Sequence, residues 1–145
     1  MTGTADQATL VLIAEDNRLD TRLIVQALQE TKGWTIQTVA VDDGQKAIAY
    51  LTQTGAFREA QKPQLVILDL NLPKHEGTEV LRLIRETRDL QTLKVFILSS
   101  SPLDAIEERI RNAQVEADGY FTKPVDLDDF LALGEVIRQS YQRRW

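Results

Sequence analysis

The chain has 145 residues, no cysteine, and 17 basic against 22 acidic side chains, for a formal net charge of −5. This length suits one domain with a proper core, and the lack of cysteine excludes a disulfide framework and a cysteine-based zinc site. The negative charge argues against a nucleic-acid binder, and the absence of a membrane span or signal peptide predicts a cytoplasmic protein.

The start of the chain predicts one buried strand and one helix. Residues 1–9 are polar and are expected to form a poorly ordered lead-in to a domain core at about 9–140. An apolar run at 10–14 predicts a buried strand that ends at Glu15 and Asp16. Asn17 would cap a helix that continues to Gly33, with a buried stripe formed by Leu19, Leu23, Ile24, Ala27 and Leu28.

The next segment predicts a less buried strand and a second helix. Residues 34–40 alternate in polarity, as is typical of a strand at or near a sheet edge. A helix would follow Asp43 and end near Gly55. The polar connection at 54–63 is somewhat long for a βα unit.

Three further strand and helix pairs complete the pattern. The most apolar strand begins at Val66 and delivers Asp69 to its end before Pro73 forces a turn. A fourth strand at 93–98 precedes Ser99, and Pro102 suits the first turn of the helix at 103–113. A fifth strand at 119–122 leads to Lys123, and a last helix would begin near residue 126.

Alternating strands and helices predict an α/β fold, a doubly wound (βα)5 parallel sheet of the flavodoxin-like kind with strand order 2-1-3-4-5. Ligands of such sheets bind beyond the carboxyl ends of the strands. The sequence places its unusual polar residues at these ends, so that segments far apart in the chain would form one pocket from Glu15, Asp16, Asp69, Ser99 and Lys123.

The expected pocket has the chemistry of phosphoryl transfer. Clustered carboxylates repel one another unless a hard cation neutralises them, and Mg²⁺ prefers such oxygen ligands. Asp16, Asp69 and the carbonyl of Asn71 would bind the ion, with Glu15 acting directly or through water. Asp69 is the expected nucleophile and Lys123 would neutralise charge.

A hydroxyl at the end of the fourth strand would donate to a phosphoryl oxygen. Ser99 is the first candidate, and Ser100 and Ser101 remain open as alternatives.

These residues together resemble the receiver domains of two-component response regulators over about residues 10–137. The resemblance rests on the acidic pair at 15–16, Asp69 with Gly77 eight positions later, Ser99 thirty positions after Asp69, and Tyr120 with Lys123. It implies a phosphoacceptor at Asp69, Mg²⁺, a switch pair at Ser99 and Tyr120, and a histidine kinase as donor. It also implies a signalling protein with at most an autophosphatase activity.

Three segments, at residues 54–63, 69–74 and 123–130, are similar to those of small single-domain regulators that partner bacterial phytochrome kinases, best known in cyanobacteria. This narrower resemblance implies a stand-alone receiver. It also implies a homodimer through the fourth helix, fifth strand and fifth helix.

Other functions remain as alternatives. One alternative is a receiver-like module that binds proteins without phosphorylation. Haloacid-dehalogenase-type hydrolases also use an aspartate nucleophile, but they carry a second acid where this chain has Asn71. Neither a Gly-x-Gly-x-x-Gly turn nor a P-loop follows any strand, which disfavours a nucleotide-binding domain.

Overall fold

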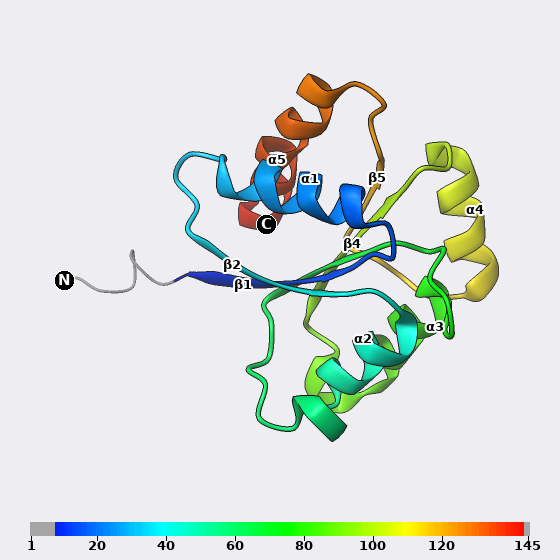
Figure 1. Ribbon diagram of the computed structural model, residues 1–145. Helices are drawn as coiled ribbons and strands as arrows, with labels where there is room; N and C mark the ends of the chain where they lie inside the picture. Colours follow the sequence, from blue (N-terminus) through cyan, green and yellow to red (C-terminus); the bar gives the residue numbers. More distant parts are fainter. Residues whose placement is uncertain (1–7, 144–145) are drawn as a thin grey trace.

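The computed structural model describes residues 8–143 as a parallel sheet between two layers of helices (Figure 1). The strands are β1 (Thr9–Ala14), β2 (Ile36–Val41), β3 (Leu65–Leu68), β4 (Lys94–Ser99) and β5 (Gly119–Thr122). The helices are α1 (Arg18–Gln29), α2 (Gly44–Leu51), α3 (Gly77–Glu86), α4 (Leu103–Ala113) and α5 (Leu127–Gln142). The strand order β2-β1-β3-β4-β5 confirms the predicted flavodoxin-like fold.

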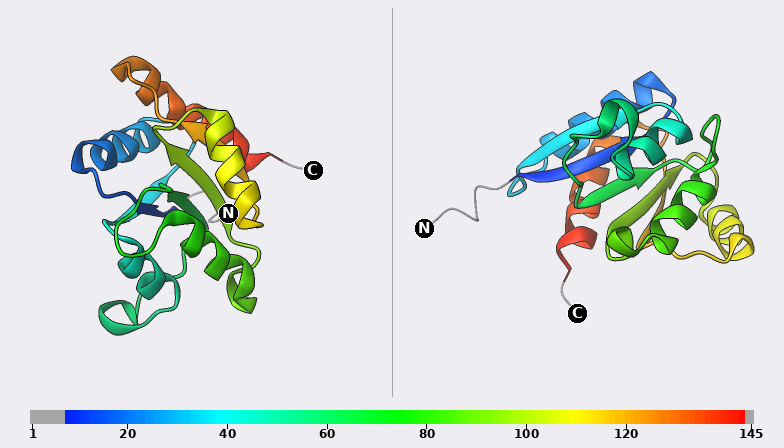
Figure 2. Two further views of the ribbon diagram at one scale, coloured as in Figure 1. Left: turned by 90° about the vertical axis from the view of Figure 1, so that its right-hand side faces the viewer. Right: turned by 90° about the horizontal axis from the view of Figure 1, so that it is seen from below.

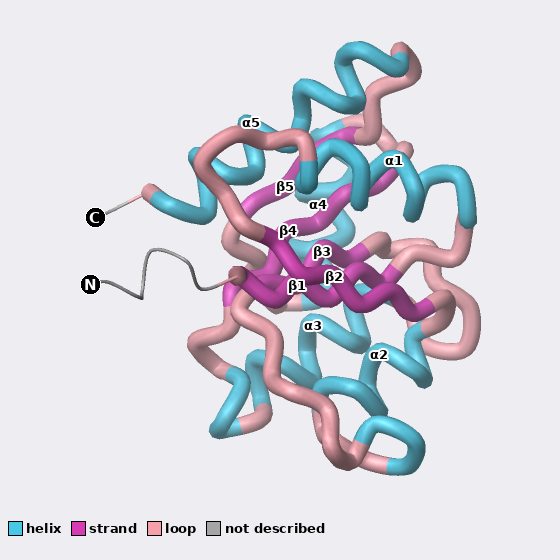
Figure 3. Tube along the Cα trace, turned by 60° about the vertical axis from the view of Figure 1, so that its left-hand side comes forward, coloured by secondary structure: helices cyan, strands magenta, loops and turns pink. Residues whose placement is uncertain are grey.

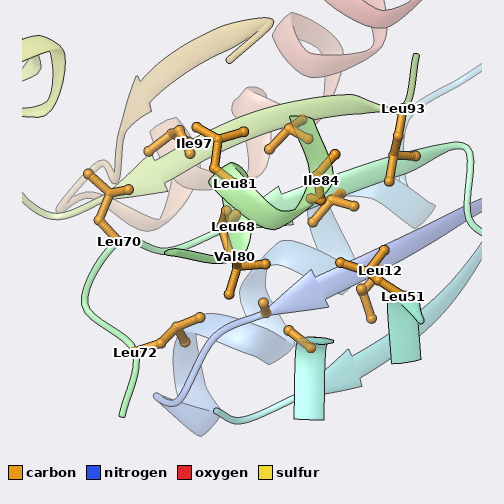
Figure 4. Close-up of a cluster of buried hydrophobic side chains, with 14 of the residues drawn as sticks. Leu12, Leu51, Leu68, Leu70, Leu72, Val80, Leu81, Ile84, Leu93 and Ile97 are labelled. Atoms are coloured by element: carbon orange, nitrogen blue, oxygen red, sulfur yellow. The ribbon is translucent and has the colours of Figure 1, made fainter. Parts of the chain in front are cut away.

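The sheet separates two hydrophobic clusters. Helices α1 and α5 cover one face, α2 and α3 cover the other, and α4 lies beside α3 (Figures 1 and 3). The side chains of β1 and β3 alternate between the clusters, because successive side chains of a strand point to opposite faces. Figure 4 shows the larger cluster, in which leucines from the strands pack against Val80, Leu81 and Ile84 of α3.

Helix α5 approaches α1 closely at one glycine. A Cβ atom added at Gly134 would lie 2.1 Å from the carbonyl oxygen of Ala27. The missing side chain therefore lets the two helices pack backbone to backbone, and this contact holds the last helix over the sheet.

The predicted caps occur, although several boundaries shift. The side chain of Asn17 accepts a hydrogen bond from the backbone of Asp20, as a helix N-cap does. Helix α1 ends at Gln29, four residues before Gly33, which instead takes a left-handed turn with φ of 78°. Leu19 is 64% exposed, so its place in the buried stripe was predicted wrongly.

The strand and helix starts also differ slightly from the prediction. β2 is an edge strand, as expected, but it begins at Ile36, because Trp34 turns into the core, stacks on Tyr141 and donates to Thr9 Oγ1. Pro102 is the N-cap of α4, one position before the expected first turn. The sequence also predicts that Leu103 is buried with Ile106 and Ile110 on one side of this helix, but Leu103 is 46% exposed.

The long connection after α2 is ordered. It contains a 3₁₀ turn at Gly55–Phe57, where the predicted helix was expected to end, and the ring of Phe57 packs edge-on against Tyr50. The hydroxyl of Tyr50 donates to the carbonyl of Gln61, which ties the connection to α2. Residues 1–7 of the predicted lead-in at 1–9 lie outside the described residues, and Thr9 already belongs to β1. Within residues 8–143, no helix has the length and apolarity that a bilayer crossing needs.

Candidate functional site

The polar residues at the strand ends meet at one edge of the sheet, as predicted. Glu15 and Asp16 follow β1, Asp69 follows β3, Ser99 ends β4, and Lys123 follows β5. The left view of Figure 2 looks toward this edge. The site is therefore assembled by the parallel order of the strands rather than by any one loop.

Lys123 is the cationic centre of the pocket. Its ammonium nitrogen lies 2.6 Å from Glu15 Oε1, 2.9 Å from Asp20 Oδ2 and 3.0 Å from Asp69 Oδ2. Burial alone would lower the pKa of Lys123, but the contacts with these carboxylates outweigh burial and raise it. Lys123 is thus a fixed positive charge beside Asp69.

Asp20 is a member of the site that the sequence did not reveal. It lies in the first turn of α1, where an acidic residue is common because it complements the helix dipole. The structure brings it to Lys123, 103 positions later in the chain. Only the tertiary structure, which brings Asp20 of α1 close to Lys123, could have shown this role.

Glu15 is buried and pairs with Lys123. Its side chain accepts a hydrogen bond from the backbone of Asn17 through Oε2. Glu15 Oε1 lies 2.6 Å from the ammonium nitrogen of Lys123, and within residues 8–143 no other group donates to this oxygen. Burial raises the pKa of Glu15 to about 7, although the nearby ammonium of Lys123 lowers it.

Glu15, Asp16 and Asp69 have the donor set of a divalent cation site. One carboxylate oxygen from each residue lies within 4.8 Å of the others. Glu15 Oε1 meets only the Lys123 ammonium within residues 8–143, and its remaining lone pair is one that a cation would satisfy. The three residues predicted from the sequence therefore fit a hard divalent metal, and an open cavity of about 720 Å³ adjoins Glu15 and Asp16.

The turn after β3 shapes the phosphoacceptor candidate. The backbone N–H of Asn71 donates to Asp69 Oδ1 at 3.0 Å, and the side chain of Asn71 accepts from Arg109 of α4 at 2.8 Å. Gly77 lies against this turn, where a Cβ atom would come 2.4 Å from the carbonyl oxygen of Asp69. The glycine predicted from spacing is thus required by a close backbone approach.

The expected hydroxyl and aromatic residues lie on neighbouring strands. Ser99 is fully buried, whereas Ser100 is exposed and Ser101 donates its backbone N–H to Ser99 Oγ at 3.3 Å. Tyr120 on β5 is half-buried and packs against the cluster beneath the sheet. Of the three serines, Ser99 is the buried one at the end of β4.

This fold, with acidic residues after β1 and β3 and a lysine after β5, defines a class of signalling protein. A family model of the response regulator receiver domain matches residues 11–134, and the chain belongs to this family.

Within this family, the chain is similar to two named response regulators, Rcp1 and RcpA. Response regulator Rcp1 of Synechocystis sp. is 31% identical over 141 residues, which cover 97% of this chain and 94% of that protein. The crystal structure of the phosphorylated cyanobacterial phytochrome response regulator RcpA is 33% identical, with a TM-score of 0.82 over 93% of this chain and 94% of that one. The Mn²⁺-bound form of Rcp1 matches with a TM-score of 0.79 and 30% identity over 90% of this chain and 92% of that one.

Proposed function

We propose that the chain is a phosphorylation-dependent switch that accepts a phosphoryl group on Asp69. The observation that carries this proposal is the placement of the Asp69 carboxylate, which lies 3.0 Å from Lys123 Nζ and within 4.8 Å of two further acids. A carboxylate beside a fixed cation and a metal-type cluster is the arrangement that phosphoryl transfer requires.

In the proposed reaction, an oxygen of Asp69 attacks the phosphorus of a phosphohistidine on a kinase. The new P–O bond makes an acyl phosphate, the P–N bond breaks, and its electron pair returns to the imidazole, which takes up a proton. Lys123 would neutralise charge on the phosphoryl oxygens, and the Ser99 hydroxyl would donate to one of them.

Mg²⁺ is the proposed cation. Glu15, Asp16 and Asp69 would bind it through carboxylate oxygens, and Asn71 through its backbone carbonyl. When bound, the ion supplies positive charge that stabilises the negative transition state. The Mn²⁺-bound form of the relative Rcp1 supports the binding of a divalent metal.

The proposed output is a change of the face formed by α4, β5 and α5. A phosphoryl group on Asp69 would draw Ser99 inward, and Tyr120 would turn into the space behind it. Ser99 ends β4 at the edge where Asp69 is found, and Tyr120 lies on the adjacent strand β5, where it pairs with Ile97.

The proposed partner is a histidine kinase of the phytochrome type, because similar proteins with high coverage are named phytochrome or bacteriophytochrome response regulators. A homodimer through the α4, β5 and α5 face is also proposed.

Residues 9–140 would form the core of one receiver domain that works in the cytoplasm, binds no nucleic acid and has at most autophosphatase activity. The net charge of −5 supports the absence of nucleic-acid binding.

The test is the intact mass of the protein after incubation with a small phosphodonor and Mg²⁺. We expect a gain of about 80 Da, the mass of one phosphoryl group, in the wild type. The gain should be absent in Asp69→Asn and in a sample with a chelator. No gain in the wild type, either with the small donor or with a phosphorylated histidine kinase, would reject the proposal and favour a module that signals without phosphorylation.

A further inference from the structure

Helix α4 is held to the rest of the protein mainly by polar contacts. Only Ile106 and Ile110 of this helix are buried. A helix with few buried apolar residues opens locally at a low free energy. The position of α4 therefore depends strongly on its polar contacts. At its C-terminal end, the guanidinium of Arg82 donates to the carbonyl of Ala113.

Arg109 lies near the middle of α4, and its side chain reaches the phosphoacceptor turn. Its Nη1 donates to Asn71 Oδ1 at 2.8 Å, and its Nη2 lies 3.7 Å from Glu76 Oε1. Glu76 is the N-cap of α3. One side chain of α4 therefore contacts both ends of the turn between β3 and α3.

The hydrogen bond to Asn71 is the stronger of the two contacts. Glu76 is mostly exposed and its distance is long, so this ion pair contributes little. Asn71, by contrast, also donates its backbone N–H to Asp69 Oδ1. The path from Arg109 to the Asp69 carboxylate thus runs through a single residue.

We propose that Arg109 is a positioning residue that couples the metal and phosphoryl site to the order of α4. The coupling would run through Asn71 and would be separate from the Ser99 and Tyr120 pair. This inference rests on the proposed function, in which the Asn71 carbonyl binds Mg²⁺. An ion that fixes this turn would fix the acceptor of the Arg109 bond, and α4 would become more ordered.

Thermodynamic reciprocity makes the proposal testable from either site. If Mg²⁺ binding orders α4 through Arg109, then Arg109 must strengthen Mg²⁺ binding by the same factor. A residue that only stabilised α4 would change the helix without changing the affinity for the metal. The two readouts together therefore separate coupling from simple stabilisation.

The experiment compares Mg²⁺ affinity by calorimetry with hydrogen exchange of residues 103–113, with and without Mg²⁺. Arg109→Ala should bind Mg²⁺ about three- to tenfold more weakly, the value of one hydrogen bond, and Mg²⁺ should no longer slow exchange in α4. Arg111→Ala is the matched control, since Arg111 lies on the same helix and its side chain makes no hydrogen bond or ion pair within residues 8–143. It should behave as the wild type does.

Two more variants test the route through Asn71. Arg109→Lys keeps the charge and one donor, and should restore part of the affinity. Asn71→Ala removes the acceptor but keeps the carbonyl, and adding Arg109→Ala to it should cause no further loss.

Two outcomes would overturn the inference. Normal Mg²⁺ affinity and a normal exchange response in Arg109→Ala, with a wild type that binds Mg²⁺, would reject the inference alone. A wild type that binds no Mg²⁺ would reject the metal site of the proposed function and this coupling with it.

Discussion

Lys123 sets the charge balance of the pocket at the scale of single residues. One ammonium group contacts the carboxylates of Glu15, Asp20 and Asp69, and Asp16 lies in the same cluster. Negative charge therefore exceeds positive charge at this edge of the sheet. The excess favours a cation and disfavours the ionised form of the most buried acid, Glu15.

The raised pKa of Glu15 predicts how stability depends on pH without metal. The pKa rises from 4.5 to about 7 on folding because of burial, so the folded protein holds the proton more tightly than the unfolded chain does. The stabilising effect is complete below pH 4.5 and is lost as the pH rises through about 7. We expect this group to remove about 1–3 kcal/mol of unfolding free energy across that range.

The measurement is urea unfolding in a chelator at several pH values for the wild type and Glu15→Gln. The difference between the two proteins isolates Glu15 from other titrating groups. A difference that stays constant between pH 4.5 and 7 would contradict the shift that burial causes.

At the scale of elements, the contact between α1 and α5 is the tightest helix packing around the site. Gly134 allows it, because any side chain there would meet the carbonyl of Ala27 and the hydroxyl of Thr31. Both helices also adjoin Lys123. Its partner Asp20 lies on α1, and α5 begins at Leu127, shortly after the lysine in the chain. The closeness of these helices thus helps to hold the lysine in place.

Gly134→Ala should lower the unfolding free energy by about 1–3 kcal/mol, because the added methyl group must push backbone apart. Val136→Ala is a suitable control, since Val136 is 46% exposed on the same helix and should change stability by less than about 0.5 kcal/mol. Chemical denaturation of both variants gives the comparison. Equal stabilities would show that the helices can separate at little cost.

The sequence predicted the elements and most of the site because these depend on local pattern. Continuous apolar runs marked β1, β3 and β4, and each ended at a polar residue that the parallel sheet then placed in the pocket. What it could not predict depends on tertiary packing. Trp34 turned into the core instead of extending β2, and Asp20 and Arg109 had no local pattern that pointed to Lys123 or Asn71.

At the scale of the whole molecule, the metal site links residues that follow two different strands, β1 and β3. A ligand that binds only the folded form stabilises it, by about 2.7 kcal/mol at a concentration one hundred times the dissociation constant. We therefore expect Mg²⁺ at that excess to raise the urea midpoint of the wild type. The buried ring of Trp34 offers a fluorescence signal for the transition.

Asp16→Asn serves as the matched variant for this measurement, because Asp16 is the exposed acid of the cluster and its change should leave the core intact. Its midpoint should respond much less to Mg²⁺. A midpoint that rises equally in both proteins would place the stabilising ion elsewhere.

The dependence of the pocket on Lys123 also has a consequence for synthesis of the protein. The acids at 15, 16, 20 and 69 leave the ribosome well before the lysine that neutralises them, which lies at the end of the fifth strand. A nascent chain that lacks this strand carries its negative cluster without the internal counter-charge. The last strand of the sheet therefore supplies the counter-charge for acids that are made much earlier.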